Sequence, residues 1–326
     1  MFHVKLVLIR RNGRYPPPKG GEYLQDSSET SSQNRAQLSL CRDFGEAGGK
    51  VSRETYIPIE KSRRSVYNIP VMGKVIALFN QKGGVGKTTT CVNLCCAFTE
   101  AGRRTLVVDC DPQGQSTSGL GIARQNAAPN TYHVLIEGVP AEKAVVSTPY
   151  GDVIPCNRDL FGSGIQLAEA EGRETILREA LKPLRDKYDF ILIDCPALLE
   201  LLTLNALCAA DSVLLPVQCE YLALEGLSEL MGTLRMIRRT LNPDLEVEGV
   251  VLTMYDGRTN LSMQVANAVK KHMKQAVCKT AIPRSVRVSE APSHGMPVLR
   301  TDRSSRGAIA YRLLAEEIMA KNPKPK

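Results

Sequence analysis

From about residue 75 to about residue 321, the chain alternates short apolar runs with longer segments of helical periodicity. The apolar runs are rich in Val, Ile and Leu and nearly continuous, which is typical of strands buried on both faces of a parallel sheet. They predict strands at 75–80, 105–110, 152–156, 190–195, 212–218, 247–255 and 277–282. The segments between them predict helices at 87–101, 174–186, 201–209, 223–240, 262–275 and 306–321. This alternation predicts an α/β fold, with a doubly wound, mostly parallel sheet and helices on both faces.

Residues 1–71 lack this pattern. They contain three consecutive prolines at 16–18 and the polar, low-complexity stretch QDSSETSSQNRAQ. They also carry 12 Lys or Arg against 7 Asp or Glu, so most of the net charge of +8 comes from them. We therefore expect a basic, disordered extension over 1–71, a P-loop domain over 72–322 and a short tail over 323–326. A helix-turn-helix within 1–71 is the alternative.

The composition is ordinary for a globular protein of 326 residues, with 43% apolar and 23% charged residues. The positive net charge favours a polyanionic partner such as nucleic acid. The absence of tryptophan and the small number of aromatic residues argue against base stacking as the main mode of binding. No apolar run approaches the roughly 20 residues that span a bilayer, so we expect a cytoplasmic protein without a membrane partner.

The ten cysteines form no C-x-x-C pair, and most lie inside apolar runs such as VVDC and ILIDC. This distribution predicts small buried thiols in a reducing compartment, not a disulfide framework or a metal site.

The stretch NQKGGVGKTTT, residues 80–90, follows the first apolar run and opens the first helix, which is the context of a phosphate-binding loop. Gly83, Gly84 and Gly86 allow backbone N–H groups to surround phosphate oxygens, and the helix N-terminus adds partial positive charge. Lys87 is expected to reach the β- and γ-phosphates, and the Thr88 hydroxyl to bind Mg²⁺. The usual pattern has a glycine where this chain has Gln81.

Carboxylates follow two further apolar runs. Asp194 ends FILID and is the expected carboxylate for the Mg²⁺ water shell. Asp109 and Asp111 lie in VVDCDPQGQS, before Gly114, which suits a mobile segment near the γ-phosphate. Ligands of open α/β sheets lie at the carboxyl ends of strands, so these groups are expected to meet there.

Six stretches together resemble the ParA/Soj family of chromosome- and plasmid-partitioning ATPases, over about residues 72–318. They are KGGVGKTT, DCDPQGQSTSGLG, FILIDCP, LLPVQCEYLALEGL, LTMYDGRTNLS and IPRSVRVSEAPSHG. The resemblance implies ATP and Mg²⁺ as cofactors, and a nucleotide site formed by Gly83, Gly84, Val85, Gly86, Lys87, Thr88, Thr89 and Pro283.

The same resemblance assigns roles to individual residues. Lys82 is the extra lysine of the family's deviant loop, which acts across a dimer interface on the partner's nucleotide. Lys87 and Asp111 are the other catalytic residues, with Asp111 positioning the attacking water and Asp194 holding the metal through water. Arg258 and Arg287 match basic positions that contact DNA.

The implied function is ATP-dependent partitioning. ATP drives formation of a homodimer, the dimer binds DNA without sequence preference at the nucleoid, and a ParB-like centromere-binding protein stimulates hydrolysis. Alternatives are a membrane-positioning ATPase resembling MinD, an iron–sulfur ATPase and a metabolic kinase. A MinD-like protein would need a terminal membrane helix, whereas the last helix here is expected to pack on the sheet.

Overall fold

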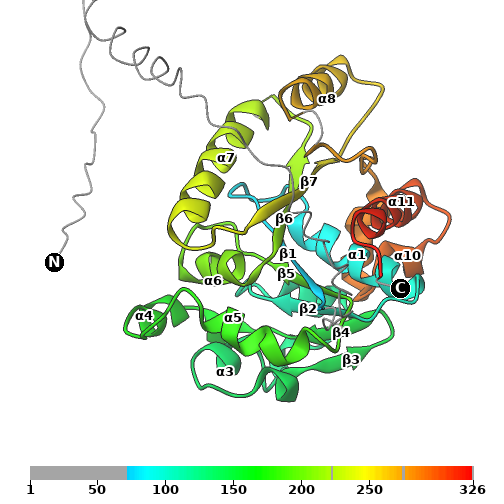
Figure 1. The fold of residues 1–326 in the computed structure, drawn as a ribbon. Coiled ribbons are helices and arrows are strands. Elements are labelled where there is room, and N and C mark those ends of the chain that lie inside the picture. Colours follow the sequence, from blue (N-terminus) through cyan, green and yellow to red (C-terminus); the bar gives the residue numbers. More distant parts are fainter. Residues whose placement is uncertain (1–71, 222, 274–275, 325–326) are drawn as a thin grey trace, which may run out of the picture. The chain divides into compact units, whose positions relative to one another are not determined.

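A seven-stranded sheet forms the centre of the protein (Figure 1). The computed structural model describes residues 72–221, 223–273 and 276–324, so the predictions for 1–71 lie outside the described residues. The strands are β1 Lys74–Leu78, β2 Thr105–Asp109, β3 Val146–Thr148, β4 Gly151–Ile154, β5 Phe190–Asp194, β6 Ser212–Gln218 and β7 Glu246–Thr253. Their order is β3-β4-β2-β5-β1-β6-β7. Only the β3–β4 pair is antiparallel, and the predicted fold class is confirmed.

Helices cover both faces of the sheet. They are α1 Lys87–Glu100, α2 Gln115–Gly119, α3 Thr131–Leu135, α4 Ser163–Ala168, α5 Ile176–Leu181, α6 Leu201–Ala209, α7 Ala223–Thr240, α8 Asn260–Met273, α9 Val286–Glu290, α10 Val298–Thr301 and α11 Arg306–Lys321. Short 3-10 turns include η1 Arg124–Asn126, η2 Ala141–Ala144, η3 Arg158–Leu160, η4 Lys182–Leu184 and η6 Ala291–His294.

Alternating residues of β1 divide the core into two clusters. Val75, Ala77 and Phe79 pack with apolar side chains of α3, α5, α6, α7 and α8. Ile76 and Leu78 pack with α1, α10 and α11 on the other face. Successive side chains of a strand point to opposite faces, so a continuous apolar run is what a sheet covered on both sides requires. Figure 1 shows the two helical layers, with α6 and α7 on one side and α1 and α11 on the other.

Strand β1 lies at the topological switch point of the sheet, where the order in which successive strands are added changes direction. It pairs with β5 on one side and β6 on the other, and both pairs are parallel. The connection through α1 leads to β2 beyond β5, whereas the later connection through α6 leads from β5 to β6. This reversal opens a crevice at the carboxyl end of β1, where open α/β sheets bind their ligands.

The prediction of a strand at 277–282 is wrong. The segment makes only an isolated bridge between Val277 and Val250, with another between Pro283 and Tyr255. In between, the carboxylate of Glu317 on α11 accepts the backbone N–H groups of Lys279, at 2.9 Å, and Thr280, at 3.2 Å. These donors are therefore not free for a strand ladder.

The helix predicted at 174–186 is shorter than expected and continues as η4, where Pro183 lacks the N–H of a regular helix. The edge strand β3 was not predicted.

A stacked aromatic pair joins α1 to the sheet. The rings of Phe98 and Phe190 have centroids 4.3 Å apart and are inclined by 13°. Both residues are fully buried. We expect Phe98→Ala to lower the free energy of unfolding by about 3–5 kcal/mol, because it leaves a cavity between α1 and β5. Urea denaturation followed by circular dichroism measures this. Leu313→Ala, at a half-exposed position of α11, is the control and should change stability by less than about 1 kcal/mol. Equal effects of the two variants would contradict a stabilising role of the Phe98–Phe190 pair.

Candidate nucleotide-binding and catalytic site

The loop between β1 and α1 has the backbone of a phosphate-binding loop. Gly84 and Gly86 have φ of 75° and 92°, a left-handed conformation in which a side chain would be strained. Gly86 is the N-cap of α1, so the unpaired N–H groups of the first turn face the loop. The predicted residues from Gly83 to Thr89 therefore surround one helix N-terminus, a suitable place for phosphate oxygens.

Two hydrogen bonds attach this loop to neighbouring strands. The Asn80 amide donates to the Pro216 carbonyl on β6 at 2.7 Å. The Thr253 hydroxyl at the end of β7 donates to the Val85 carbonyl at 2.8 Å. Both bonds are buried and join residues far apart in sequence. They hold the glycine-rich backbone in one conformation before any ligand binds.

Lys87 lies inside the loop. It is 7% exposed, and its Nζ donates to the Lys82 carbonyl at 3.3 Å. Burial lowers the pKa of Lys87, and the nearby carboxylates of Asp194 and Asp111 oppose that shift. The structure therefore brings Lys87 together with both acidic residues that the sequence selects.

Asp109 and Asp194 are buried side by side, because β2 and β5 pair in a register that places them opposite each other. Burial raises the pKa of both carboxyls, and the charge of Asp194 adds to the rise for Asp109. Thr117 donates to Asp109 Oδ2 from its N–H at 2.8 Å and from its hydroxyl at 2.7 Å, and Ser116 donates to Asp194 Oδ2 at 2.6 Å. These donors oppose the rise in both pKa values but do not cancel it.

The other oxygen of Asp194, Oδ1, is buried and has no hydrogen-bond partner among the described residues. A buried carboxylate oxygen without a donor is costly unless it meets a cation or ordered water. Oxygen ligands of this kind suit Mg²⁺, which keeps several waters of its own. The Thr88 hydroxyl lies close enough to Asp194 to lower the pKa of that carboxyl, so the two residues together fit a hydrated magnesium ion.

Asp111 lies in a tight turn after β2. Its carboxylate accepts the Gln113 N–H at 2.9 Å, and its carbonyl accepts the Gly114 N–H at 2.8 Å. The residue is partly exposed, in contrast to the buried Asp109. Asp111 is therefore accessible to solvent, and its charge acts on the buried Lys87 of the loop.

A cavity of about 150 Å³ lies beyond the loop. It is lined by Gly86, Thr89, Thr253, Met254, Ile282, Pro283, Arg284, Ser285, Val288, Ser289 and Tyr311. Pro283 and Thr89 were both selected from sequence, and the structure places them in this one cavity. Its position beside the start of α1 suits the sugar or base of a nucleotide whose phosphates lie in the loop.

The three remaining predicted residues lie outside this pocket. Lys82 forms an ion pair with Glu220. Arg258 pairs with Asp256 through two bonds, Nε–Oδ1 at 2.9 Å and Nη2–Oδ2 at 2.8 Å, and lowers the pKa of that carboxyl to about 2. Arg287 forms two longer ion pairs, Nη1 to Glu290 Oε2 at 3.4 Å and Nε to Asp302 Oδ2 at 3.6 Å.

The comparisons with known proteins agree with this geometry. Residues 73–247 match the model of an AAA domain family. The chain is 51% identical over 251 residues to the sporulation initiation inhibitor protein Soj of Bacillus subtilis, covering 76% of this chain and 99% of Soj. It is 48% identical over 253 residues to the chromosome partitioning protein ParA of Myxococcus xanthus, covering 77% of this chain and 89% of that protein. The chain belongs to the ParA/Soj family of partitioning ATPases.

A solved structure extends the likeness of this ParA/Soj member to three dimensions. The cobyrinic acid a,c-diamide synthase of Mycobacterium smegmatis, solved with ADP and magnesium, superposes with a TM-score of 0.67 at 39% identity. The match covers 75% of this chain and 93% of that one. The predictions of the family and of a P-loop ATPase are confirmed.

Sequence reasoning missed several residues that shape the site of this ATPase. Ser116, Thr117, Asn80 and Thr253 act through hydrogen bonds to the catalytic segments. Ser and Thr after a strand-end carboxylate are common in loops, so their spacing alone carried little signal. Glu220 lies in the LLPVQCEYLALEGL stretch, but nothing in the sequence indicates that it pairs with Lys82.

The Thr253 hydroxyl provides a test of the loop's attachment. We expect Thr253→Val to lower the free energy of unfolding by about 1–2 kcal/mol and to weaken ATP binding, because it removes the only side-chain donor that the described residues offer to the Val85 carbonyl. Thermal unfolding and ATP titration calorimetry measure the two effects. Thr253→Ser keeps the hydroxyl and is the matched control. Unchanged ATP affinity in Thr253→Val would show that the bond is dispensable.

Proposed function

We propose that this ATPase, with ATP and Mg²⁺ as its cofactors, partitions copies of a chromosome or plasmid. It does so by a cycle of ATP-driven dimerisation, DNA binding and hydrolysis. The observation that carries the proposal is the buried Lys87 of the glycine-rich loop, on which the charges of Asp194 and Asp111 act, in a chain half identical to Soj over nearly all of Soj. The homodimer, the sequence-tolerant DNA contact and stimulation by a ParB-like protein are parts of this proposal. So is association with the nucleoid in the cytoplasm.

Within one subunit, the loop N–H groups and Lys87 would hold the phosphates, and Thr88 and Asp194 would hold a hydrated magnesium ion, which when bound would supply neutralising charge at the phosphates. Asp111 orients the attacking water. Lys82 reaches the nucleotide of a second subunit, so hydrolysis and dimer formation depend on each other. Charge neutralisation of this kind is the main contribution that proteins make to phosphoryl transfer.

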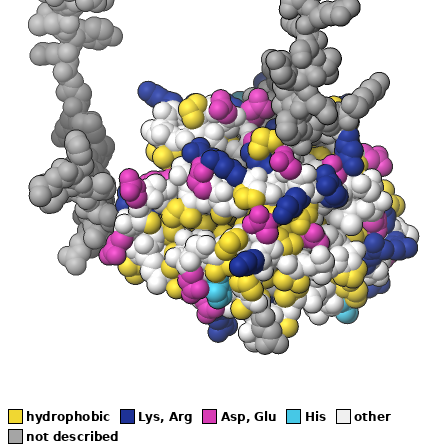
Figure 2. Space-filling model, turned by 60° about the horizontal axis from the view of Figure 1, so that its bottom comes forward, with side chains coloured by type: hydrophobic (Ala, Val, Ile, Leu, Met, Phe, Trp, Pro, Cys, Tyr) yellow, Lys and Arg dark blue, Asp and Glu magenta, His cyan; other side chains and the backbone are white. Residues whose placement is uncertain are grey.

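DNA contact is assigned to Arg258 and Arg287. The segments that carry them are joined just before each arginine, since Tyr255 donates to the Ile282 carbonyl and Arg284 donates to the Tyr255 carbonyl, both at 3.0 Å. The two side chains are 90% and 66% exposed. DNA phosphates can compete with the carboxylate partners of both arginines: the longer contacts of Arg287 contribute little, whereas the two-bond pair of Arg258 with Asp256 is the stronger one to displace. On the face in Figure 2, basic side chains are interspersed with acidic and apolar ones. The net positive charge alone therefore does not locate a DNA-binding surface.

The MinD-like alternative is not favoured by the last helix. Helix α11 buries Ala308, Tyr311, Leu314 and Ile318 against the sheet. One apolar face of α11 is therefore used in the core, as expected from the sequence, while Ile309 and Leu313 of the same helix stay about half exposed. The helices of the described residues include none with the length and apolar character needed to cross a bilayer.

Asp111 tests the catalytic assignment. A carboxylate that orients water contributes to the transition state and little to ATP binding, so Asp111→Ala should lower turnover about 10²-fold to 10⁴-fold. Its ATP affinity should remain within about threefold of the wild type, and its ATP-bound dimer should accumulate on DNA. Lys87→Ala, in contrast, should lose nucleotide binding. Turnover assays, calorimetry and DNA retention measure these outcomes. Weak ATP binding without DNA retention would assign Asp111 to the metal instead.

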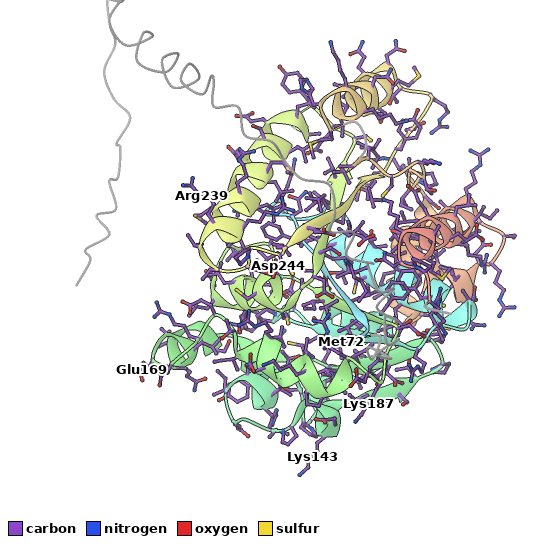
Figure 3. All side chains as sticks on the ribbon, viewed as in Figure 1. Met72, Lys143, Glu169, Lys187, Arg239 and Asp244 are labelled. Carbon is purple, nitrogen blue, oxygen red and sulfur yellow. The ribbon has the colours of Figure 1, made fainter. Side chains whose placement is uncertain are left out.

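Arg258 and Arg287 test the DNA contact. Each phosphate contact releases counterions, so Arg258→Ala and Arg287→Ala should each reduce the slope of log affinity against log salt by about one unit. ATP-driven dimerisation should persist in both variants. Arg239→Ala is the matched control, because Arg239 lies in the last turn of α7 and projects outward in Figure 3. An unchanged slope in both variants, with binding lost on deletion of 1–71, would transfer the contact to the extension.

A further inference from the structure

Lys82, the second lysine of the phosphate loop, is engaged within its own subunit. Its ammonium forms an ion pair with the carboxylate of Glu220. The Lys82 side chain is 48% exposed and that of Glu220 is 32% exposed, so the pair lies at the surface beside the loop. Lys87, five residues along, is buried and directed into the loop. The two lysines are thus held by different partners in different environments.

The backbone fixes both ends of this ion pair. The Lys82 N–H donates to Asn80 Oδ1 at 2.9 Å, and the Asn80 amide in turn donates to Pro216 on β6. Glu220 lies two residues beyond the end of β6, where its N–H donates to the Gln218 carbonyl at 2.9 Å and its carbonyl accepts from Ala223 at 3.0 Å. Because β1 and β6 are neighbours, their carboxyl ends bring Lys82 and Glu220 together.

We propose that Glu220 retains Lys82 in the monomer and thereby raises the threshold for ATP-driven dimerisation. The inference rests on the proposed trans role of Lys82. A lysine that must contact a second subunit's nucleotide has to leave Glu220 first, so the ion pair stabilises the monomer relative to the dimer. Glu220 acts through Lys82 and is therefore a positioning residue.

The size of the effect follows from the exposure of the pair. An ion pair at the surface favours the paired over the released side chain by about 1.4-fold to 5-fold. A symmetric dimer releases two such pairs, so the dimer dissociation constant should change by about 2-fold to 30-fold. Such a pair is weak enough to be broken by phosphate charge, and in the absence of that charge it biases Lys82 toward Glu220. Its contribution should shrink as salt screens the charges.

The first experiment measures dimerisation of the full-length protein by light scattering, with a slowly hydrolysed ATP analogue and Mg²⁺. We expect Glu220→Gln to dimerise at a protein concentration about 2-fold to 30-fold lower than the wild type at low salt, with the difference lost at high salt. Glu225→Gln removes the same charge from an exposed position in the first turn of α7 and should match the wild type. Lys82→Ala with Glu220→Gln should be as monomeric as Lys82→Ala alone.

The second experiment measures the accessibility of Lys82 directly. An ammonium held in an ion pair reacts slowly with an amine-acylating reagent, so without nucleotide Lys82 should be acylated faster in Glu220→Gln than in Glu225→Gln, as read by mass spectrometry. Weaker dimerisation of Glu220→Gln, or unchanged Lys82 acylation, would overturn the proposal. If Lys82→Ala dimerises normally, the trans role itself fails, whatever the acylation result.

Discussion

Two carboxylates buried side by side constrain the whole site. Asp109 and Asp194 are opposite each other in the β2–β5 register, and burial raises both pKa values. Such a pair is stable only if donors or cations surround it, and each neighbouring element supplies one. Helix α2 begins where Ser116 and Thr117 can donate to it, and the charge of Lys87 lies nearby. Asp194 Oδ1, in contrast, is buried without a donor among the described residues, a position that suits a hydrated cation.

The glycine-rich loop illustrates how a flexible sequence becomes a rigid site. Three glycines would be mobile in isolation, because each loses much conformational freedom on ordering. Here Asn80 and Thr253 attach the loop to β6 and β7, the two strands on the side of β1 away from the carboxylates. The phosphate site is therefore positioned between acidic strand ends on one side and anchoring strand ends on the other.

The residues for which we propose a role beyond the subunit have a different character. Lys82, Arg258 and Arg287 are at least half exposed or close to it, and each pairs with a surface carboxylate of its own chain. Pairs of this kind are weak and sensitive to salt, so a polyanion can displace them. Lys87, which we propose to bind the subunit's own nucleotide, is instead held by burial and by a hydrogen bond to the Lys82 carbonyl. This difference matches a protein that holds ATP firmly and changes its partners during a cycle.

The sequence by itself determined the fold class, the phosphate loop, the two acidic strand ends and the family. These features depend on local order: apolar runs long enough to be buried on both faces, and glycines and carboxylates directly after them. Only the tertiary structure decided what the segment at 277–282 does, because Glu317, some 37 residues away, takes the backbone donors that a strand would need. It also decided that Thr253 supports Val85 and that Glu220 holds Lys82. Such contacts join residues far apart in sequence through the order of strands in the sheet, which no local pattern records.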